Sequence, residues 1–347
     1  TIKRKRLNRE RTLLSRRELG TSSGGIGEVE GETTRARLRA YSWVPESGFR
    51  RGGGSGSLGR NPSSRLIPCC GHPWSGLATG SSSDAGKRRS SQGHTKVKFG
   101  FSLVKGKVNH PMEDYHVAKF VQMRGQELGL FAIFDGHMGH SVPAYLQKHL
   151  FTNILKEEEF WTNPELAIRK AYEKTDEAIL SHRPDLGRGG STAVTAILIN
   201  GRKLWIANIG DSRAVLAKGQ QVLQLTVDHD PSTERRSIEN RGGFVSIMPG
   251  DVPRVNGQLA VSRAFGDKDL KRHLRSDPDV RCVDVAADTD LLILASDGIW
   301  KVMSNKEAIE IARKATDPQA AARQLTTAAL ERDSTDDISC IVIQLQV

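Results

Sequence analysis

The sequence has 347 residues, of which 51 are Lys or Arg and 40 are Asp or Glu, giving a formal charge of +11 and a pI near 9.6. The whole excess lies in residues 1–93, which hold 18 basic and 7 acidic residues, so residues 94–347 are formally neutral. The net charge is therefore no evidence that the body of the chain binds nucleic acid or a membrane surface.

Residues 1–93 are expected to form a disordered, basic tail rich in Gly, Ser and Arg. They contain 16 of the 34 glycines, and their apolar residues follow neither a helical nor a strand period, so too little surface would be buried to offset the cost of ordering. The GxGxxG match at 54–59 neither follows a strand nor opens a helix, and we interpret it as an accident of composition. Because the sequence begins with Thr1, we leave open whether this segment is a real tail or an artefact of the gene model.

Residues 94–347 are predicted to fold as a second region. Strands are expected at 101–105, 114–121, 128–134, 191–200, 202–209, 213–218, 221–225, 291–296 and 338–347, and helices at 139–156, 164–182, 232–243, 305–315 and 318–332. The strands come in hairpins and the helices in pairs, without a regular alternation of single strands and helices. This order predicts an α+β fold in which an antiparallel sheet sandwich is flanked by helix pairs.

The cysteines and the apolar runs limit the compartment. Four cysteines, two of them adjacent, do not make a disulfide framework, and no Cys-x-x-Cys pair is present for zinc. The sequence contains no run of about 18 apolar residues, so no transmembrane helix is expected. The first residues lack the apolar core of a secretory signal. We therefore expect a cytoplasmic protein, a nuclear protein, or both.

Acidic residues stand at the ends of several predicted strands. Three follow a buried apolar strand and two pairs precede one: Asp135, Asp211, Asp297, Glu113–Asp114 and Asp336–Asp337. Carboxylates gathered at one edge of a sandwich favour Mg²⁺ or Mn²⁺ over zinc, and such ions activate water and neutralise phosphoryl oxygens. A hydrolase of phosphate esters is the leading reaction class, although a simple turn is the alternative for any single Asp-Gly pair. His137 is either a proton donor to the leaving group or an exposed bystander.

Successive motifs resemble those of the type 2C serine/threonine protein phosphatases, which are metal-dependent. The motifs are GLFAIFDGHMG, GRGGSTAV, IANIGDSRAVL, DHDPSTERRSIENRGG, VNGQLAVSRAFGD, ILASDGIW and DDISCIVI, in unbroken order between about residues 95 and 347. The run KGKVNHPMEDYHVAKFVQ resembles a plant clade of small, single-domain members. The resemblance implies that residues 94–347 are a catalytic domain, built as a four-layer αββα sandwich of two mostly antiparallel sheets.

The resemblance also implies a centre of two Mg²⁺ or Mn²⁺ ions, at which a metal-bound water hydrolyses phosphoserine or phosphothreonine directly. The implied ligands are Asp114, Asp135, Gly136 through its carbonyl, Asp297 and Asp336, with Glu113 acting through water and Asp211 holding a third metal. His137 is implied as the general acid. Residues 235–256 correspond to a flap beside the active site.

Three positions depart from the family pattern, and the mildest is Asp337, where the family usually has Asn. Asn109 stands where many members have an Arg that binds the substrate phosphate, and Lys107 is the candidate substitute. Lys301 stands where the family usually has an Asp ligand of the third metal, so we expect that site to be weakened or lost, with the ammonium facing Asp211. These departures leave a pseudophosphatase, which binds phosphoproteins with impaired turnover, as the alternative function.

The expected partners are proteins that carry phosphoserine or phosphothreonine, including kinases or their substrates. No specific nucleic acid and no membrane is expected, because the basic tail has few aromatic residues for stacking on bases. Residues 243–256 contain no Trp, the flap residue with which one plant clade contacts the abscisic-acid receptor, so we do not expect that partner. We expect a monomer.

Overall fold

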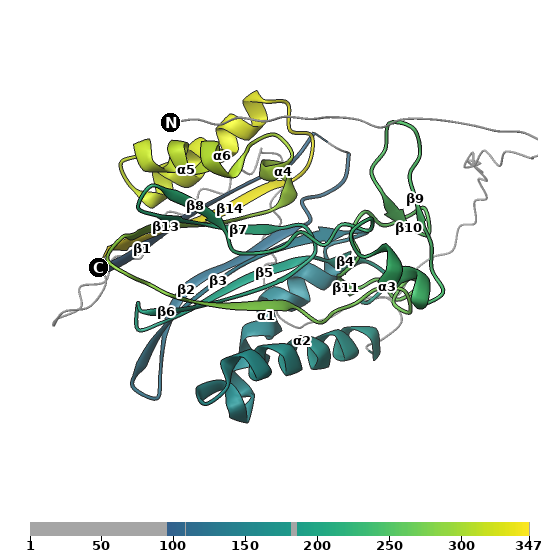
Figure 1. Ribbon diagram of the computed structural model, residues 1–347, viewed down its shortest axis with the longest axis horizontal. Coiled ribbons are helices and arrows are strands. Elements are labelled where there is room, and N and C mark those ends of the chain that lie inside the picture. Colours follow the sequence, from purple (N-terminus) through teal and green to yellow (C-terminus); the bar gives the residue numbers. More distant parts are fainter. Residues whose placement is uncertain (1–95, 108, 182–185, 347) are drawn as a thin grey trace, which may run out of the picture. The chain divides into compact units, whose positions relative to one another are not determined.

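The computed structural model describes residues 96–107, 109–181 and 186–346, and the predicted tail of residues 1–93 lies outside these ranges. Two sheets lie face to face, and helices cover the outer face of each one (Figure 1). Every ladder between the named strands is antiparallel. The predicted four-layer αββα sandwich is thereby confirmed.

The first sheet has five strands in the order β1-β14-β13-β7-β8. Their bounds are β1 Lys96–Val104, β14 Ile338–Gln346, β13 Thr289–Ala295, β7 Arg213–Lys218 and β8 Gln221–Gln224. Helices α5 (Asn305–Lys314) and α6 (Pro318–Glu331) cover this sheet. The short helix α4 (Asp297–Trp300) begins two residues after β13 ends.

The second sheet has seven strands in the order β11-β4-β3-β5-β6-β12, with β2 also paired to β3. Their bounds are β2 Asp114–Met123, β3 Gln126–His137, β4 Gly190–Ser191, β5 Ala193–Ile199, β6 Lys203–Ile209, β11 Phe265–Gly266 and β12 Asp279–Asp284. Helices α1 (Ser141–Lys156) and α2 (Pro164–Ser181) cover it, joined by the 3₁₀ turn Glu158–Trp161.

The third group of elements is the segment predicted to be the flap. It contains α3 (Arg235–Asn240) and the small pair β9 (Val245–Ser246) and β10 (Arg254–Val255). The helix is shorter than the predicted 232–243, because Asp230 accepts the backbone N–H of Ser232 and holds the preceding residues in a turn.

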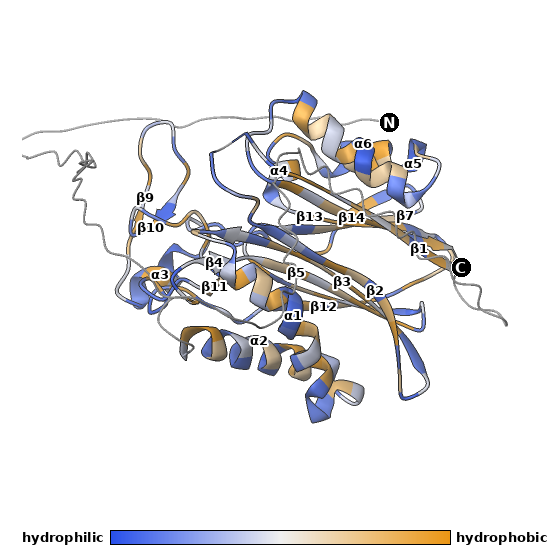
Figure 2. Ribbon diagram, turned by 180° about the vertical axis from the view of Figure 1, so that it is seen from behind, coloured by the Kyte–Doolittle hydropathy of each residue, from blue (hydrophilic) through white to orange (hydrophobic). Residues whose placement is uncertain are grey.

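Strand β3 shows why the sandwich has several apolar layers. Phe131 and Ile133 belong to the core between the two sheets, whereas Leu130, Ala132 and Phe134 belong to the core under α1 and α2. Successive residues of a strand point to opposite faces, so an unbroken apolar run is what a strand buried on both sides requires. A further core lies between the first sheet and α5 and α6. Figure 2 shows hydrophobic residues along the strands of both sheets and hydrophilic ones in most connecting loops.

Strand β12 is the main element that the sequence did not predict. Its residues DVRCVD carry few apolar side chains, and Arg281 and Cys282 are exposed. The strand lies at the edge of the second sheet and, among the described strands, pairs with β6 alone. An edge strand of this kind buries too little to leave a clear period in the sequence. Among the helices of the described residues, none is long and apolar enough to cross a membrane.

Candidate metal centre

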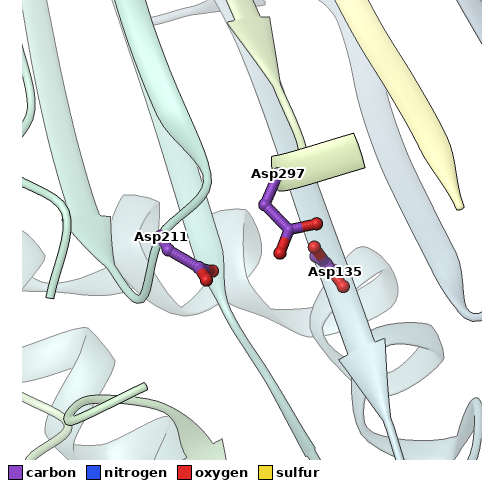
Figure 3. A group of neighbouring side chains, drawn as sticks. All are labelled: Asp135, Asp211 and Asp297. Atoms are coloured by element: carbon purple, nitrogen blue, oxygen red, sulfur yellow. The ribbon is translucent and has the colours of Figure 1, made fainter. Parts of the chain in front are cut away.

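Asp135, Asp211 and Asp297 meet where three strands end. Asp135 lies near the end of β3, Asp211 follows β6, and Asp297 is the first residue of α4 after β13. One carboxylate oxygen from each of the three residues lies within 4.8 Å of the other two, and Figure 3 shows the side chains gathered around one space. The sheet stacking thus brings together carboxylates that are separated by as many as 162 residues in the sequence.

Asp114 lies beside this group because β2 and β3 pair with Asp114 directly opposite Asp135. It is only 3% exposed, and its Oδ2 accepts a hydrogen bond from the hydroxyl of Ser339 on β14. Oδ1 of Asp114 and Oδ1 of Asp297 are buried without a hydrogen-bond partner among the described residues. A buried acceptor without a donor lowers the stability of the folded protein. A hard divalent cation, which is coordinated by several carboxylate oxygens, would satisfy these atoms. The residues therefore fit such an ion.

The carboxylates are electrostatically unfavourable to one another. Burial raises the pKa of Asp114 to about 7 and that of Asp211 to about 8, and nearby carboxylates add to both shifts. Burial and neighbouring carboxylates also raise the pKa of Asp135 and of Asp297. Charged groups that are withdrawn from water and face like charges disfavour ionisation. A cation placed among them would remove that penalty and keep them ionised.

Lys301 supplies a positive charge at one side of the cluster. Its ammonium lies 2.6 Å from Oδ2 of Asp297 and 2.8 Å from Oδ2 of Asp336, the remaining predicted ligand. The sequence expectation placed this ammonium opposite Asp211. Its ion pairs are with Asp297 and Asp336, although its charge also acts on Asp211 and opposes the rise in the pKa of that carboxyl. The reason is the helical turn of α4, which Lys301 directly follows. Residues four apart on such a turn lie on the same face, so the side chain of Lys301 lies beside that of Asp297.

Several groups near the cluster hold the backbone in place. Oε1 of Glu113 accepts the N–H of Gly139 at 2.8 Å, and Asp337 accepts the N–H groups of Gly106 and Glu113, each at 2.8 Å. At Gly136 a Cβ would lie 2.6 Å from the ring of Pro143, so no larger residue fits there without movement. The water-mediated role of Glu113 and the carbonyl role of Gly136 stay predictions.

His137 enters the same cavity and is held by a carboxylate. The cavity has a volume of about 360 Å³ and is lined by His137, Asp267 and the three clustered aspartates, among others. Nε2 of His137 lies 2.8 and 2.9 Å from the two oxygens of Asp267. Burial by itself would lower the pKa of His137, but the charge and hydrogen bond of Asp267 outweigh it and the net shift is upward. An imidazole held in this way beside the acidic cluster could donate a proton when it carries one.

Lys107 is not among the described residues that line the cavity. Its ammonium pairs with Asp333 at 3.0 Å, whereas Arg254 of β10 and His110 do line the cavity. The proposed contact of Lys107 with a substrate phosphate stays a prediction.

Asp267 and Ser339 were not among the residues expected at the site. Asp267 is the last residue of the motif VNGQLAVSRAFGD, and that position was the available signal. Its contact with His137 spans 130 residues of sequence, so no local pattern reveals it. Ser339 lies inside an apolar strand, where a hydroxyl that faces a carboxylate cannot be distinguished from one satisfied by the backbone.

Comparison with known proteins identifies the family. Residues 100–338 match the family described as protein phosphatase 2C. The chain belongs to this family. It is 69% identical over 265 residues to "Probable protein phosphatase 2C 10" of Arabidopsis thaliana, covering 76% of this chain and 93% of the relative. It is 63% identical over 279 residues to "Probable protein phosphatase 2C 41" of Oryza sativa subsp. japonica, covering 80% and 98%.

Among solved structures, the serine-threonine phosphatase 2C of Toxoplasma gondii superposes with a TM-score of 0.61 at 25% identity, covering 72% of this chain and 95% of that one. The predicted resemblance to plant type 2C phosphatases and the predicted enzyme class, a serine/threonine protein phosphatase, are confirmed. The family is metal-dependent, and the acidic cluster of this chain could bind metal. Nothing in the comparisons supports the pseudophosphatase alternative.

Proposed function

We propose that this protein phosphatase 2C hydrolyses phosphoserine and phosphothreonine in proteins by direct attack of water, with two Mg²⁺ or Mn²⁺ ions held in the acidic cluster. The observation that carries the proposal is the convergence of Asp135, Asp211 and Asp297 on the cavity that His137 also enters. The buried Oδ1 atoms of Asp297 and of the neighbouring Asp114, which have no hydrogen-bond partner among the described residues, support it. The residues that would hold the ions are Asp114, Asp135, Asp297 and Asp336, with the carbonyl of Gly136. Bound there, the ions would polarise water and neutralise the phosphoryl oxygens.

The protein's own groups would then orient the ester and supply a proton. His137 would donate a proton to the serine or threonine oxygen as the P–O bond breaks, so that the departing group leaves as a neutral hydroxyl. Water contributes the new oxygen on phosphorus, and inorganic phosphate is the second product. Glu113 would act through water at the metal centre, and it also accepts the N–H of Gly139 in the loop that follows His137.

We propose that Asp211 holds a third ion only weakly. Asp211 lies within the carboxylate group, but the ammonium of Lys301 occupies the adjacent side of Asp297. A positive charge there opposes a further cation, which supports a site with two principal ions.

The substrates and the compartment are proposed from the sequence. We propose phosphoserine and phosphothreonine proteins as partners, including kinases or their substrates, and action as a monomer in the cytoplasm or nucleus. The flap segment between Gly243 and Asn256 carries no Trp, which supports a function independent of the abscisic-acid receptor.

Phosphate release from a phosphothreonine peptide tests the proposal. Activity should require Mn²⁺ or Mg²⁺ and vanish with EDTA. Asp135→Asn and Asp297→Asn should each reduce kcat by on the order of a thousandfold, since each removes a ligand worth several kcal/mol of transition-state stabilisation. Asp284→Asn is the matched control, because this carboxylate is 81% exposed at the end of β12. Near-normal rates in either ligand variant would refute the metal assignment.

A further inference from the structure

The contact between His137 and Asp267 is built by three neighbouring strands. In the second sheet, β4 lies between β3 and β11, with His137 opposite Gly190 and Gly190 opposite Gly266. The side chains of His137 and Asp267 therefore meet over the backbone of Gly190. A Cβ at Gly190 would lie 2.1 Å from Oδ2 of Asp267 and 2.4 Å from Nε2 of His137. Glycine at this position is what leaves room for the pair.

Asp267 is held in an unusual backbone conformation. Its φ is +54°, a region that residues other than glycine and Asn or Asp rarely adopt and that costs on the order of 1 kcal/mol. Its N–H donates to the carbonyl of Gly189 at 2.9 Å, and the N–H of Gly266 donates to the buried carboxylate of Asp176 at 2.8 Å. Both neighbouring peptide groups are thus fixed, which aims the carboxylate at His137.

The pair leaves one ring nitrogen of His137 for the reaction. Both oxygens of Asp267, which is 4% exposed, lie within 2.9 Å of Nε2. Within the described part of the chain, no hydrogen bond to Nδ1 of His137 is present, and the residue lines the cavity beside Asp135. Nδ1 is therefore the nitrogen from which a proton could reach the departing oxygen.

We propose that Asp267 is the positioning residue of the general acid: it holds His137 at Nε2 so that the proton on Nδ1 is delivered to the leaving serine or threonine oxygen. This inference rests on the proposed function, which makes His137 the acid. When the P–O bond breaks, its electron pair goes to the leaving oxygen, which takes the proton from Nδ1. Water adds to phosphorus and releases one proton to solvent, hydrogen phosphate leaves, and His137 regains a proton from solvent.

The structural alternative is that the pair only ties β4 and β11 to β3. Leaving groups separate the two roles. Nitrophenolate departs readily as an anion and needs little protonation, whereas a threonine alkoxide needs a proton. Loss of a correctly placed acid should therefore slow a phosphothreonine peptide much more than p-nitrophenyl phosphate, whereas a general loosening of the fold would slow both alike.

The experiment compares kcat on both substrates, at saturating Mn²⁺, for Asp267→Asn, His137→Gln and the control Asp269→Asn. Asp269 is exposed two residues further along the chain, and its variant should change neither rate. We expect His137→Gln to lower the rate on the peptide at least about a hundredfold more than on p-nitrophenyl phosphate, within the range of general acid catalysis. Asp267→Asn should show the same preference, about tenfold or more, and should add nothing to it in the double variant.

Three results would decide the matter. If His137→Gln shows the preference and Asp267→Asn does not, the positioning role is wrong and the proposed function stands. If His137→Gln shows no preference, the acid assignment in the proposed function fails, and the inference fails with it. If Asp267→Asn does not fold, Gly190→Ala provides the second variant, because its methyl group displaces the pair while keeping both side chains. An equal loss on the two substrates in Gly190→Ala would overturn the inference.

Discussion

Replacing Lys301 by Gln is expected to tighten the binding of divalent metal. The ammonium of Lys301 lies 2.6 Å from Asp297 and 2.8 Å from Asp336, so it already neutralises part of the charge that a metal ion would meet. A metal ion that binds these carboxylates must share them with the ammonium or displace it. Glutamine keeps a polar chain of similar length and removes the charge.

The magnitude follows from Coulomb's law. The side chain of Lys301 is 54% exposed, so a dielectric close to that of water applies. A divalent ion and an ammonium about 4 Å apart then repel each other by about 2 kcal/mol, twice the value for two unit charges. Removing the ion pairs also leaves the carboxylates less satisfied in the metal-free protein, which acts in the same direction. Counterions reduce the sum, and we expect a roughly 10- to 30-fold lower Kd.

Isothermal titration calorimetry of the metal-free protein with Mn²⁺ measures this Kd directly, without relying on turnover. Lys306→Gln is the matched control, because that lysine is 80% exposed on α5 and its contact with Glu310 is 3.9 Å long. The control should bind Mn²⁺ as the unmodified protein does. An unchanged or higher Kd for Mn²⁺ in Lys301→Gln would show that the ammonium does not compete with metal at this edge.

The remaining predictions concern stability, measured by urea unfolding. Burial lowers the pKa of His116 to about 4, so as pH falls below about 6.5 the imidazole takes up a proton in the unfolded chain before it does so in the folded protein. The free energy of unfolding should therefore fall by about 2 kcal/mol between pH 7 and pH 5, and this loss should be absent in His116→Gln. The same pH dependence in both proteins would contradict this. Asp337→Ala should lower the free energy of unfolding by about 2–4 kcal/mol, because the N–H groups of Gly106 and Glu113 lose their acceptor. Asp337→Asn keeps one acceptor oxygen and should lower it by less. Equal losses in the two variants would count against this account. Gly298→Ala should destabilise by at least about 1 kcal/mol despite the helix preference of alanine, because its Cβ would lie 2.1 Å from the carbonyl of Asp337; a neutral result would show that the backbone yields there.

The sequence predicted the parts of the fold in which local patterning and burial agree. Strand β3 is an unbroken apolar run ending in Asp135, and such a run with a polar end predicts both the buried strand and the carboxylate at its edge. A helix was also expected at 305–315, and α5 begins at Asn305, where Ser304 and Glu307 form a capping box. The apolar run thus marks the buried part of β3, which continues through Asp135 to His137, and the capping box marks the start of α5.

The contacts that tune the site could not be predicted in this way. Whether Lys301 faces Asp211 or Asp297 depends on the turn of α4, a helix of only four residues with no period to read. The position of Asp267 against His137 depends on the registers of two-residue strands that are set by the rest of the sheet. Tertiary packing decides such contacts, and single-sequence patterns do not encode it locally.

The carboxylates of the candidate centre come from both sheets. Asp135 and Asp211 extend from β3 and β6 of the second sheet, whereas Asp297 follows β13 and Asp336 precedes β14 of the first. Without a cation, their repulsion acts between the two sheets at this edge, and a cation shared among them would connect the sheets. Because such an ion binds only when the sandwich is packed, its binding free energy adds to the free energy of unfolding. Metal affinity and the stability of the sandwich are therefore coupled, and a substitution in the core between the sheets should weaken metal binding without touching a ligand.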